Sequence, residues 1–236
     1  MPSRLTFEVC TENVAGVCAA ERAGAHRVEL CSALAEGGVT PSLGLVKEAR
    51  TKTDIPLHIL VRPRGGDFCY TPQELGVMLA DIALFKDAGA HGLVFGALLK
   101  DGSLDLAGMT RLLEAAHPLP VTFHRAFDVC RAPHKVLEQL VALGVPRLLT
   151  SGQARDAPTG AKLLRTLVEQ ASDRLVVMAG GGVRTSNAAG LVRDTGVAEL
   201  HFSAQRPVQP SLLPFAFGSP AQTDEASIAA LIRSLS

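Results

Sequence analysis

The sequence predicts a single (β/α)8 barrel, a TIM barrel of parallel strands, with residues 1–236 as one domain. Eight apolar, β-rich runs recur along the chain, and an amphipathic segment follows each of them. Four helix-to-strand junctions read almost alike, each with a Gly suited to end a helix in the left-handed conformation: AGAHRVEL, AGAHGLVF, LGVPRLLT and TGVAELHF. The length of 236 residues and the 47% hydrophobic content suit one barrel-sized core.

The expected strands are, in chain order, LTFEVC, RVELCS, PLHILVRP, GLVFGAL, PVTFHRAFD, RLLTSG, RLVVMAGG and ELHFSAQ. Near-continuous apolar strands that alternate with helices indicate a parallel sheet covered by helices. The last unit is the weakest: residues 206–224 read as an irregular Pro-rich loop that could cross one mouth, and residues 225–236 as the closing helix. A doubly wound open sheet is the alternative, but neither GxGxxG after the first strand nor GxxxxGK[ST] occurs.

Composition narrows the range of partners. The 23 basic and 23 acidic residues cancel and form no run of like charge, so we expect no nucleic-acid partner. No apolar stretch has the ~18 residues of a membrane span, and we expect neither a membrane partner nor a signal peptide. Five cysteines without a CxxC pair favour free thiols and a cytoplasmic location.

Polar residues gather where the strands end, which is where the active sites of such barrels lie. This face predicts a small-molecule site built from two carboxylates, arginines, histidines and a glycine loop. The candidate catalytic residues are Glu8, Glu29, Arg62, His124, Asp128 and His201. The candidate anion-binding residues are Arg62, Arg64, Gly180, Gly181, Gly182 and Ser203.

Eight motifs in order carry a resemblance to a known family: EVC, ELCSALAEGGVTPS, VRPRGGDF, GLVFGAL, PVTFHRAFD, LLTSG, VVMAGGGV and ELHFSA. Over residues 5–205 the chain resembles the copper homeostasis protein CutC family. The resemblance implies a cytoplasmic TIM barrel that forms homo-oligomers, with Cu(I) proposed to bind the cysteines of EVC and ELC, here Cys10 and Cys31. Three positions depart from the family pattern, Ala33, Val39 and Ala179, and the segment after Gln205 follows it less closely.

The chemistry of the two cysteine thiols is compatible with the copper function. Thiolate is a soft ligand that favours Cu(I). Cys10 and Cys31 occupy corresponding positions of adjacent expected strands, which predicts backbones ~5 Å apart if the register aligns. The alternative is that both cysteines only fill volume, because free cysteine is among the most buried residue types.

Two other function classes remain open from the residues. The first is an enzyme, a lyase, isomerase or hydrolase, acting on a small anionic metabolite such as a phosphorylated one. Glu8 or Glu29 would be the base, His124 the acid, and the MAGGGVRTSN loop with Arg62 the anion site.

No Lys lies on an expected strand, which argues against a Schiff-base aldolase. HExxH is absent, so zinc hydrolysis would need a site gathered from several strands. The second class is a binding or scaffold protein without chemistry.

Overall fold

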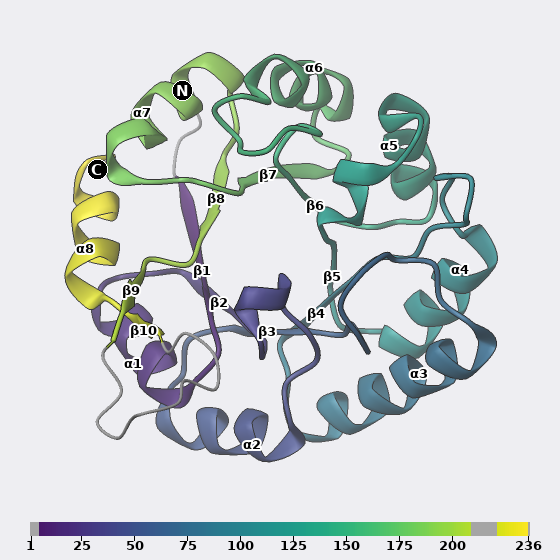
Figure 1. The fold of residues 1–236 in the computed structure, drawn as a ribbon, viewed down its shortest axis with the longest axis horizontal. Coiled ribbons are helices and arrows are strands. Elements are labelled where there is room, and N and C mark those ends of the chain that lie inside the picture. Colours follow the sequence, from purple (N-terminus) through teal and green to yellow (C-terminus); the bar gives the residue numbers. More distant parts are fainter. Residues whose placement is uncertain (1–4, 209–220, 236) are drawn as a thin grey trace, which may run out of the picture.

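Eight parallel strands close into a barrel in the order of the sequence, which confirms the predicted fold. The computed structural model describes residues 5–208 and 221–235. Each strand pairs with the next along the chain, and β1 and β8 close the ring (Figure 1). The strands are β1 (Thr6–Thr11), β2 (Arg27–Leu30), β3 (Leu57–Leu60), β4 (Gly92–Phe95), β5 (Val121–Phe123), β6 (Arg147–Thr150), β7 (Val176–Gly180) and β8 (Glu199–Phe202).

A ring of helices surrounds the barrel in Figure 1. They are α1 (Val14–Arg22), α2 (Leu43–Lys52), α3 (Pro72–Asp87), α4 (Leu106–Ala116), α5 (Pro133–Ala142), α6 (Ala161–Ala171), α7 (Thr185–Thr195) and α8 (Glu225–Arg233). The junction glycines predicted to end helices have positive φ, with 87°, 82°, 72° and 75° at Gly24, Gly89, Gly144 and Gly196. None of the described helices is long and apolar enough to cross a membrane.

Hydrophobic packing lies mainly between the barrel and its helices. Side chains such as Val9, Phe85, Leu112 and Leu164 are buried there, and they belong to one continuous core. The interior of the barrel is different, because it contains a layer of buried charge. We call this layer the charged floor; its members are Glu8, Arg27, Arg147 and Glu199.

Opposite charges alternate through the charged floor. Arg27 donates to the carboxylates of both Glu8 and Glu199, with Nη2 2.6 Å from Oε2 of Glu199. Arg147 completes the layer through Nε, 2.7 Å from the same Glu199 oxygen. Two arginines therefore face two glutamates, and the charges of this layer sum to zero.

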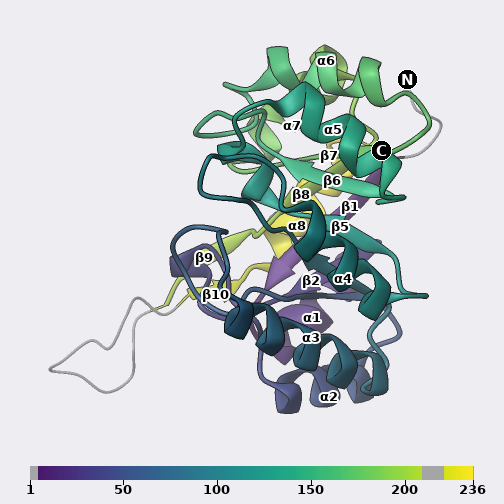
Figure 2. The ribbon, with the colours of Figure 1, turned by 90° about the vertical axis from the view of Figure 1, so that its right-hand side faces the viewer.

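The late segment departs from the irregular loop expected over residues 206–224. Strands β9 (Gln205–Pro207) and β10 (Ala221–Thr223) form a two-stranded antiparallel sheet. The Oγ1 atoms of Thr223 and Thr11 are 2.8 Å apart, which joins β10 to the end of β1. In Figure 2, β9 and β10 lie at the end of the barrel away from the N-terminus. The rest of the expected loop, residues 209–220, lies outside the described residues.

Candidate metal and ligand site at the barrel mouth

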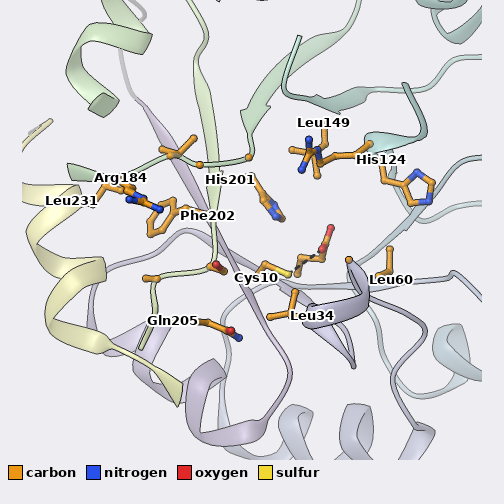
Figure 3. A pocket seen from close by; sticks show the side chains of 18 of the residues that line it. Cys10, Leu34, Leu60, His124, Leu149, Arg184, His201, Phe202, Gln205 and Leu231 are labelled. Atoms are coloured by element: carbon orange, nitrogen blue, oxygen red, sulfur yellow. Dashed lines mark hydrogen bonds between the residues drawn. The ribbon is translucent and has the colours of Figure 1, made fainter. Parts of the chain in front are cut away.

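A cavity of about 810 Å³ opens at the carboxyl ends of the strands (Figure 3). This is the face on which the sequence predicted a site. Eight of the predicted residues line the cavity: Cys10, Glu29, Arg62, His124, Gly181, Gly182, His201 and Ser203. Two more, Glu8 and Cys31, are fully buried and contact residues of the lining.

The two thiols predicted to bind copper are neighbours. Cys10 Sγ lies 3.6 Å from Cys31 Sγ, and both residues are buried. The expected register was nevertheless wrong. Cys10 pairs with Glu29 across β1 and β2, and Cys31 follows β2, where its N–H donates to the carbonyl of Thr11 at 3.0 Å. Adjacent strands of a closed barrel are staggered, so equal positions in two motifs need not be opposite each other.

Glu29 connects the thiol pair to the cavity. The Cys10 thiol donates to Glu29 Oε1 at 3.2 Å, whereas Oε2 of Glu29 is buried without a hydrogen-bond partner. Burial, with a contribution from the nearby Glu8 carboxylate, raises the pKa of Glu29. The hydrogen bond with Cys31 and burial raise the pKa of the Cys10 thiol well above its usual range. Burial therefore opposes the charged form of both groups.

His201 approaches the same place from β8. Its Nδ1 lies 2.7 Å from Oε1 of Glu8. Although burial alone would raise the pKa of Glu8, the adjacent Arg27 and His201 hold it well below the usual range, so Glu8 is a carboxylate. Burial opposes the charged imidazole, but Glu29 and Glu8 together raise the pKa of His201. The Glu8 carboxylate thus accepts a hydrogen bond from Nδ1–H of His201, which fixes the orientation of the ring.

One group of possible metal ligands stands out in the described parts of the chain. One ligand atom each from Cys10, Glu29 and His201 lies within 4.8 Å of the other two. In Figure 3 the labelled side chains of Cys10 and His201 lie close together in the cavity. We call Cys10, Cys31, Glu29 and His201 the mouth cluster.

Arg62 is held by the loops. Its Nη1 donates to the carbonyls of Glu36 and Gly38 at 3.0 and 2.7 Å, and its Nη2 donates to the carbonyl of Gly66 at 2.9 Å. The guanidinium also lies over the Phe68 ring, 4.9 Å from its centroid. Only Nε is left without a partner. In this arrangement Arg62 clamps two loops together and has one donor free for a ligand.

His124 lies near Arg62, with its ring 4.8 Å from the same Phe68 ring, and is the N-cap of the short helix η2 (Arg125–Val129). Its Nδ1 accepts from the N–H of Ala126 at 3.3 Å, and Nε2 is buried without a partner. Burial and the charge of Arg62 lower the pKa of His124 to about 3. Near pH 7 the ring is therefore neutral and offers Nε2–H as a donor.

The three remaining predicted residues, like Glu8 and Cys31, are not part of the cavity lining. Arg64 binds Glu74 and Asp67 and the carbonyls of its own loop. Asp128 accepts from Arg125, from Thr150 and Ser151, and from the N–H of Gln153, which makes it the centre of a loop network. Gly180 is buried in β7, one residue before the lining begins.

Two features of the site were not predicted from the sequence. The first is the charged floor, because Arg27 and Arg147 stand at strand starts where a polar residue usually faces solvent. The second is Arg184, which lines the cavity together with Thr185 and Ser186 at the start of α7. Its position in the glycine loop GGGVRTSN was the signal that could have identified it.

Comparison with known proteins identifies the family to which the chain belongs. The CutC family model matches residues 5–206. The chain belongs to the CutC family. The resemblance seen in the eight motifs is thereby confirmed. CutC of Pasteurella multocida is 50% identical over 201 residues, which cover 85% of this chain and 82% of that protein. The human copper homeostasis protein cutC homolog is 48% identical over 199 residues, which cover 84% and 73%.

Solved structures agree with the family assignment. The crystal structure of CutC from Streptococcus agalactiae superimposes with a TM-score of 0.80 at 37% identity, covering 84% of this chain and 98% of that one. More distant barrels include phosphoribosylanthranilate isomerase of Thermotoga maritima, with a TM-score of 0.59 at 12% identity. At that identity the likeness concerns the fold alone.

Proposed function

We propose that this member of the CutC family is a cytoplasmic protein that binds Cu(I) through the thiolates of Cys10 and Cys31. One observation carries the proposal: the two Sγ atoms are 3.6 Å apart, buried, and beside the cavity. Two thiolates satisfy the low coordination number and the softness of Cu(I). The donor set therefore fits the metal that the family name implies.

The surroundings of the thiol pair favour a monovalent, easily oxidised ion. Cys10 and Cys31 pack in a small buried cluster with Leu60 and Val94, and Leu34 covers it. Apolar side chains around a metal control solvent access and lower the local dielectric. Cys10 lines the cavity while Cys31 lies behind it, so the ion would arrive at Cys10 first.

The free-thiol state of the cysteines supports the proposed cytoplasmic location. All five are free thiols, and the two that would bind copper must stay reduced to do so. The homo-oligomer implied by the family belongs to the same proposal, and light scattering coupled to size-exclusion chromatography would test it.

A competitive Cu(I) titration of the reduced protein against a chelator of known affinity tests the proposal. We expect one ion per chain, and a loss of affinity of ~100-fold or more in Cys10→Ser and in Cys31→Ser, because each removes one of two ligands. Cys18→Ser is the matched control, since its thiol lies on α1 away from the mouth. Unchanged affinity in the Cys10→Ser/Cys31→Ser double variant would contradict the proposal.

A second candidate function, chemistry on a small anionic metabolite, is favoured by the size of the cavity. A volume of about 810 Å³ suits a small molecule better than a bare ion. Arg184, Thr185 and Ser186 offer an exposed charge and two hydroxyls at the start of α7. A thermal-shift screen of phosphorylated compounds tests this function, and a real ligand should stabilise the wild type more than Arg184→Ala.

A further inference from the structure

We propose that Cys10, Glu29 and His201 form a second metal site, for a divalent cation of borderline softness such as Zn²⁺, with one coordination position open to the cavity. This proposal does not rest on Cu(I) binding. The two sites share Cys10 and differ in every other ligand, so one chain would hold one ion or the other at this position.

The donor set and its spacing fit zinc. Zn²⁺ takes sulfur, nitrogen and oxygen ligands together, whereas Cu(I) prefers soft thiolates. The three ligand atoms lie within 4.8 Å of one another. Usual Zn–S and Zn–N bond lengths place tetrahedral ligands roughly 3.3–3.8 Å apart. Cys10 Sγ and Glu29 Oε1 are already 3.2 Å apart, so small side-chain rotations complete the set.

His201 is oriented as metal-binding histidines usually are. Its Nδ1 is bound to the Glu8 carboxylate at 2.7 Å, which leaves Nε2 as the ligand atom. Glu8 in turn is fixed by Arg27, a member of the charged floor. A carboxylate behind the ligating imidazole sets its tautomer and raises its basicity as a ligand. The chain therefore provides the second layer of the site as well as the first.

Glu29 supplies an independent sign that a ligand belongs here. The residue is 5% exposed, it lines the cavity, and its Oε2 has no hydrogen-bond partner. A buried carboxylate oxygen without a partner is costly, and native structures rarely leave one unless a water or an ion satisfies it. A cation held by Glu29 removes that cost.

Charge balance favours a divalent ion over a monovalent one. The charged floor below sums to zero, with two arginines facing two glutamates. The Cys10 thiolate and the Glu29 carboxylate add two negative charges, and His201 bound through Nε2 is neutral. A divalent cation neutralises these two charges in a buried place, where uncompensated charge is expensive.

The open position separates this site from a structural zinc centre. Structural zinc usually has four protein ligands, whereas three protein ligands and one exchangeable position are typical of catalytic zinc. Cys10, Glu29 and His201 all border the cavity of about 810 Å³. The fourth ligand would come from the cavity, as a water or as an oxygen of a small molecule. This site therefore accounts for the volume of the cavity, which a buried Cu(I) ion between two thiolates does not need.

The test is a Zn²⁺ titration of the reduced full-length protein against a chromophoric chelator, with Co²⁺ as a spectroscopic probe. We expect one Zn²⁺ per chain, and a thiolate-to-Co²⁺ charge-transfer band that Cys10→Ser abolishes. His201→Ala and Glu29→Gln should each weaken Zn²⁺ binding by ~100-fold or more, since even a change behind the first ligands costs about 10–100-fold. His134→Ala, on the exposed face of α5, is the matched control.

Cys31→Ser separates the two metal sites. We expect it to keep Zn²⁺ affinity within about threefold while Cu(I) affinity falls, and His201→Ala to do the reverse. Circular dichroism of each variant confirms that it is folded. The proposal is overturned if the wild type binds no Zn²⁺, or if folded His201→Ala and Glu29→Gln both bind it as tightly as the wild type. Either result leaves the Cu(I) proposal standing, because that depends on Cys31.

Discussion

The charged floor and the mouth cluster lie in the same barrel, one layer apart. They differ in whether their buried polar atoms have hydrogen-bond partners. In the floor, Arg27, Arg147 and Glu199 are joined by hydrogen bonds of 2.6 and 2.7 Å. In the mouth, Glu29 Oε2 has no partner, and the same is true of Arg62 Nε and His124 Nε2 on the walls around it. Glu8 belongs to the floor and reaches the mouth through His201.

The difference separates charged groups that are paired within the fold from buried polar groups that have an atom without a hydrogen-bond partner. A buried charge layer whose members are all paired contributes structure, and breaking it leaves an unpaired charge. Unpaired buried donors and acceptors are destabilising, and three of the six such side-chain atoms in the described residues border this one cavity, the others belonging to Arg50, His58 and Tyr70. The cation and ligand binding proposed above would satisfy the three atoms at the mouth.

The largest expected effect comes from breaking the floor. Arg27→Met removes the cation between Glu8 and Glu199, so that Glu8 keeps only His201 and Glu199 keeps only Arg147 as an ion-pair partner. We expect the free energy of unfolding at pH 7 to fall by about 3–5 kcal/mol, measured by urea denaturation. The matched control is Arg22→Met, whose partner Glu225 lies at the surface, and which should change stability little. Equal effects of the two substitutions would remove the distinction between floor and surface.

A second prediction concerns the neutral ring beside the floor. Burial, with the charges of Arg27 and Arg147, lowers the pKa of His58 from 6.5 to about 3. A group with a depressed folded pKa stabilises the protein above its unfolded pKa, and this contribution is lost as the pH falls from 6.5 toward 3. The loss should be on the order of a few kcal/mol, because each pKa unit corresponds to ~1.4 kcal/mol.

The measurement is the free energy of unfolding between pH 7 and pH 4 in the wild type and in His58→Phe. The His58 ring packs against Gly92, where an added Cβ would lie only 2.6 Å from the imidazole. Phe places a ring in the same space but cannot titrate. We expect a shallower pH dependence in the variant, with the remainder due to His124, whose pKa is also lowered to about 3. His134→Gln, at an exposed position, should keep the wild-type slope. If the free energy of unfolding of His58→Phe depends on pH as in the wild type, the His58 ring is hydrated and water reaches the charged floor.

The strands, the junction glycines and the polar end of the barrel could be predicted from the sequence for a physical reason. Strands covered on both sides are continuously apolar, and a left-handed helix end selects glycine. The register could not be predicted, because barrel stagger is a property of all eight strands together. For that reason the sequence placed Cys10 opposite Cys31, whereas its strand partner is Glu29.

The role of individual arginines was also beyond the sequence. Arg62 has the pattern of an anion-binding residue, yet backbone carbonyls of two loops occupy most of its donors. Arg27 was not among the predicted site residues, yet it is buried at the centre of the charged floor. Both outcomes depend on loop and strand geometry far away in the sequence. The three-residue strands β9 and β10 were missed because so short a run has no measurable periodicity.

The smallest effect is expected at the rim of the mouth. Ala33 has φ 52° and ψ 55°, the left-handed conformation, just before the short helix η1 (Leu34–Glu36). That conformation costs an L-residue roughly 1–2 kcal/mol. A Gly removes this strain, but it also raises the conformational entropy of the unfolded chain, so only part of the cost is recovered as stability. We expect Ala33→Gly to raise stability by about 0.5–1 kcal/mol, which thermal unfolding would detect as a rise in Tm of roughly 1–4 °C.

Ala35→Gly, two residues later inside η1, is the matched control and should lower stability, because its backbone has no positive φ to relieve. A gain in both variants would assign the effect to loop flexibility. The loop that carries Ala33 also covers the thiol pair: a Cβ on Gly38 would lie 3.7 Å from Cys31 Sγ. Cu(I) affinity in Ala33→Gly therefore sharpens the comparison of the two layers. If the free energy of unfolding rises in Ala33→Gly while its Cu(I) affinity falls, the strained turn at Ala33 holds the loop in place over Cys31. The mouth then loses stability in favour of binding, which the paired charges of the floor do not.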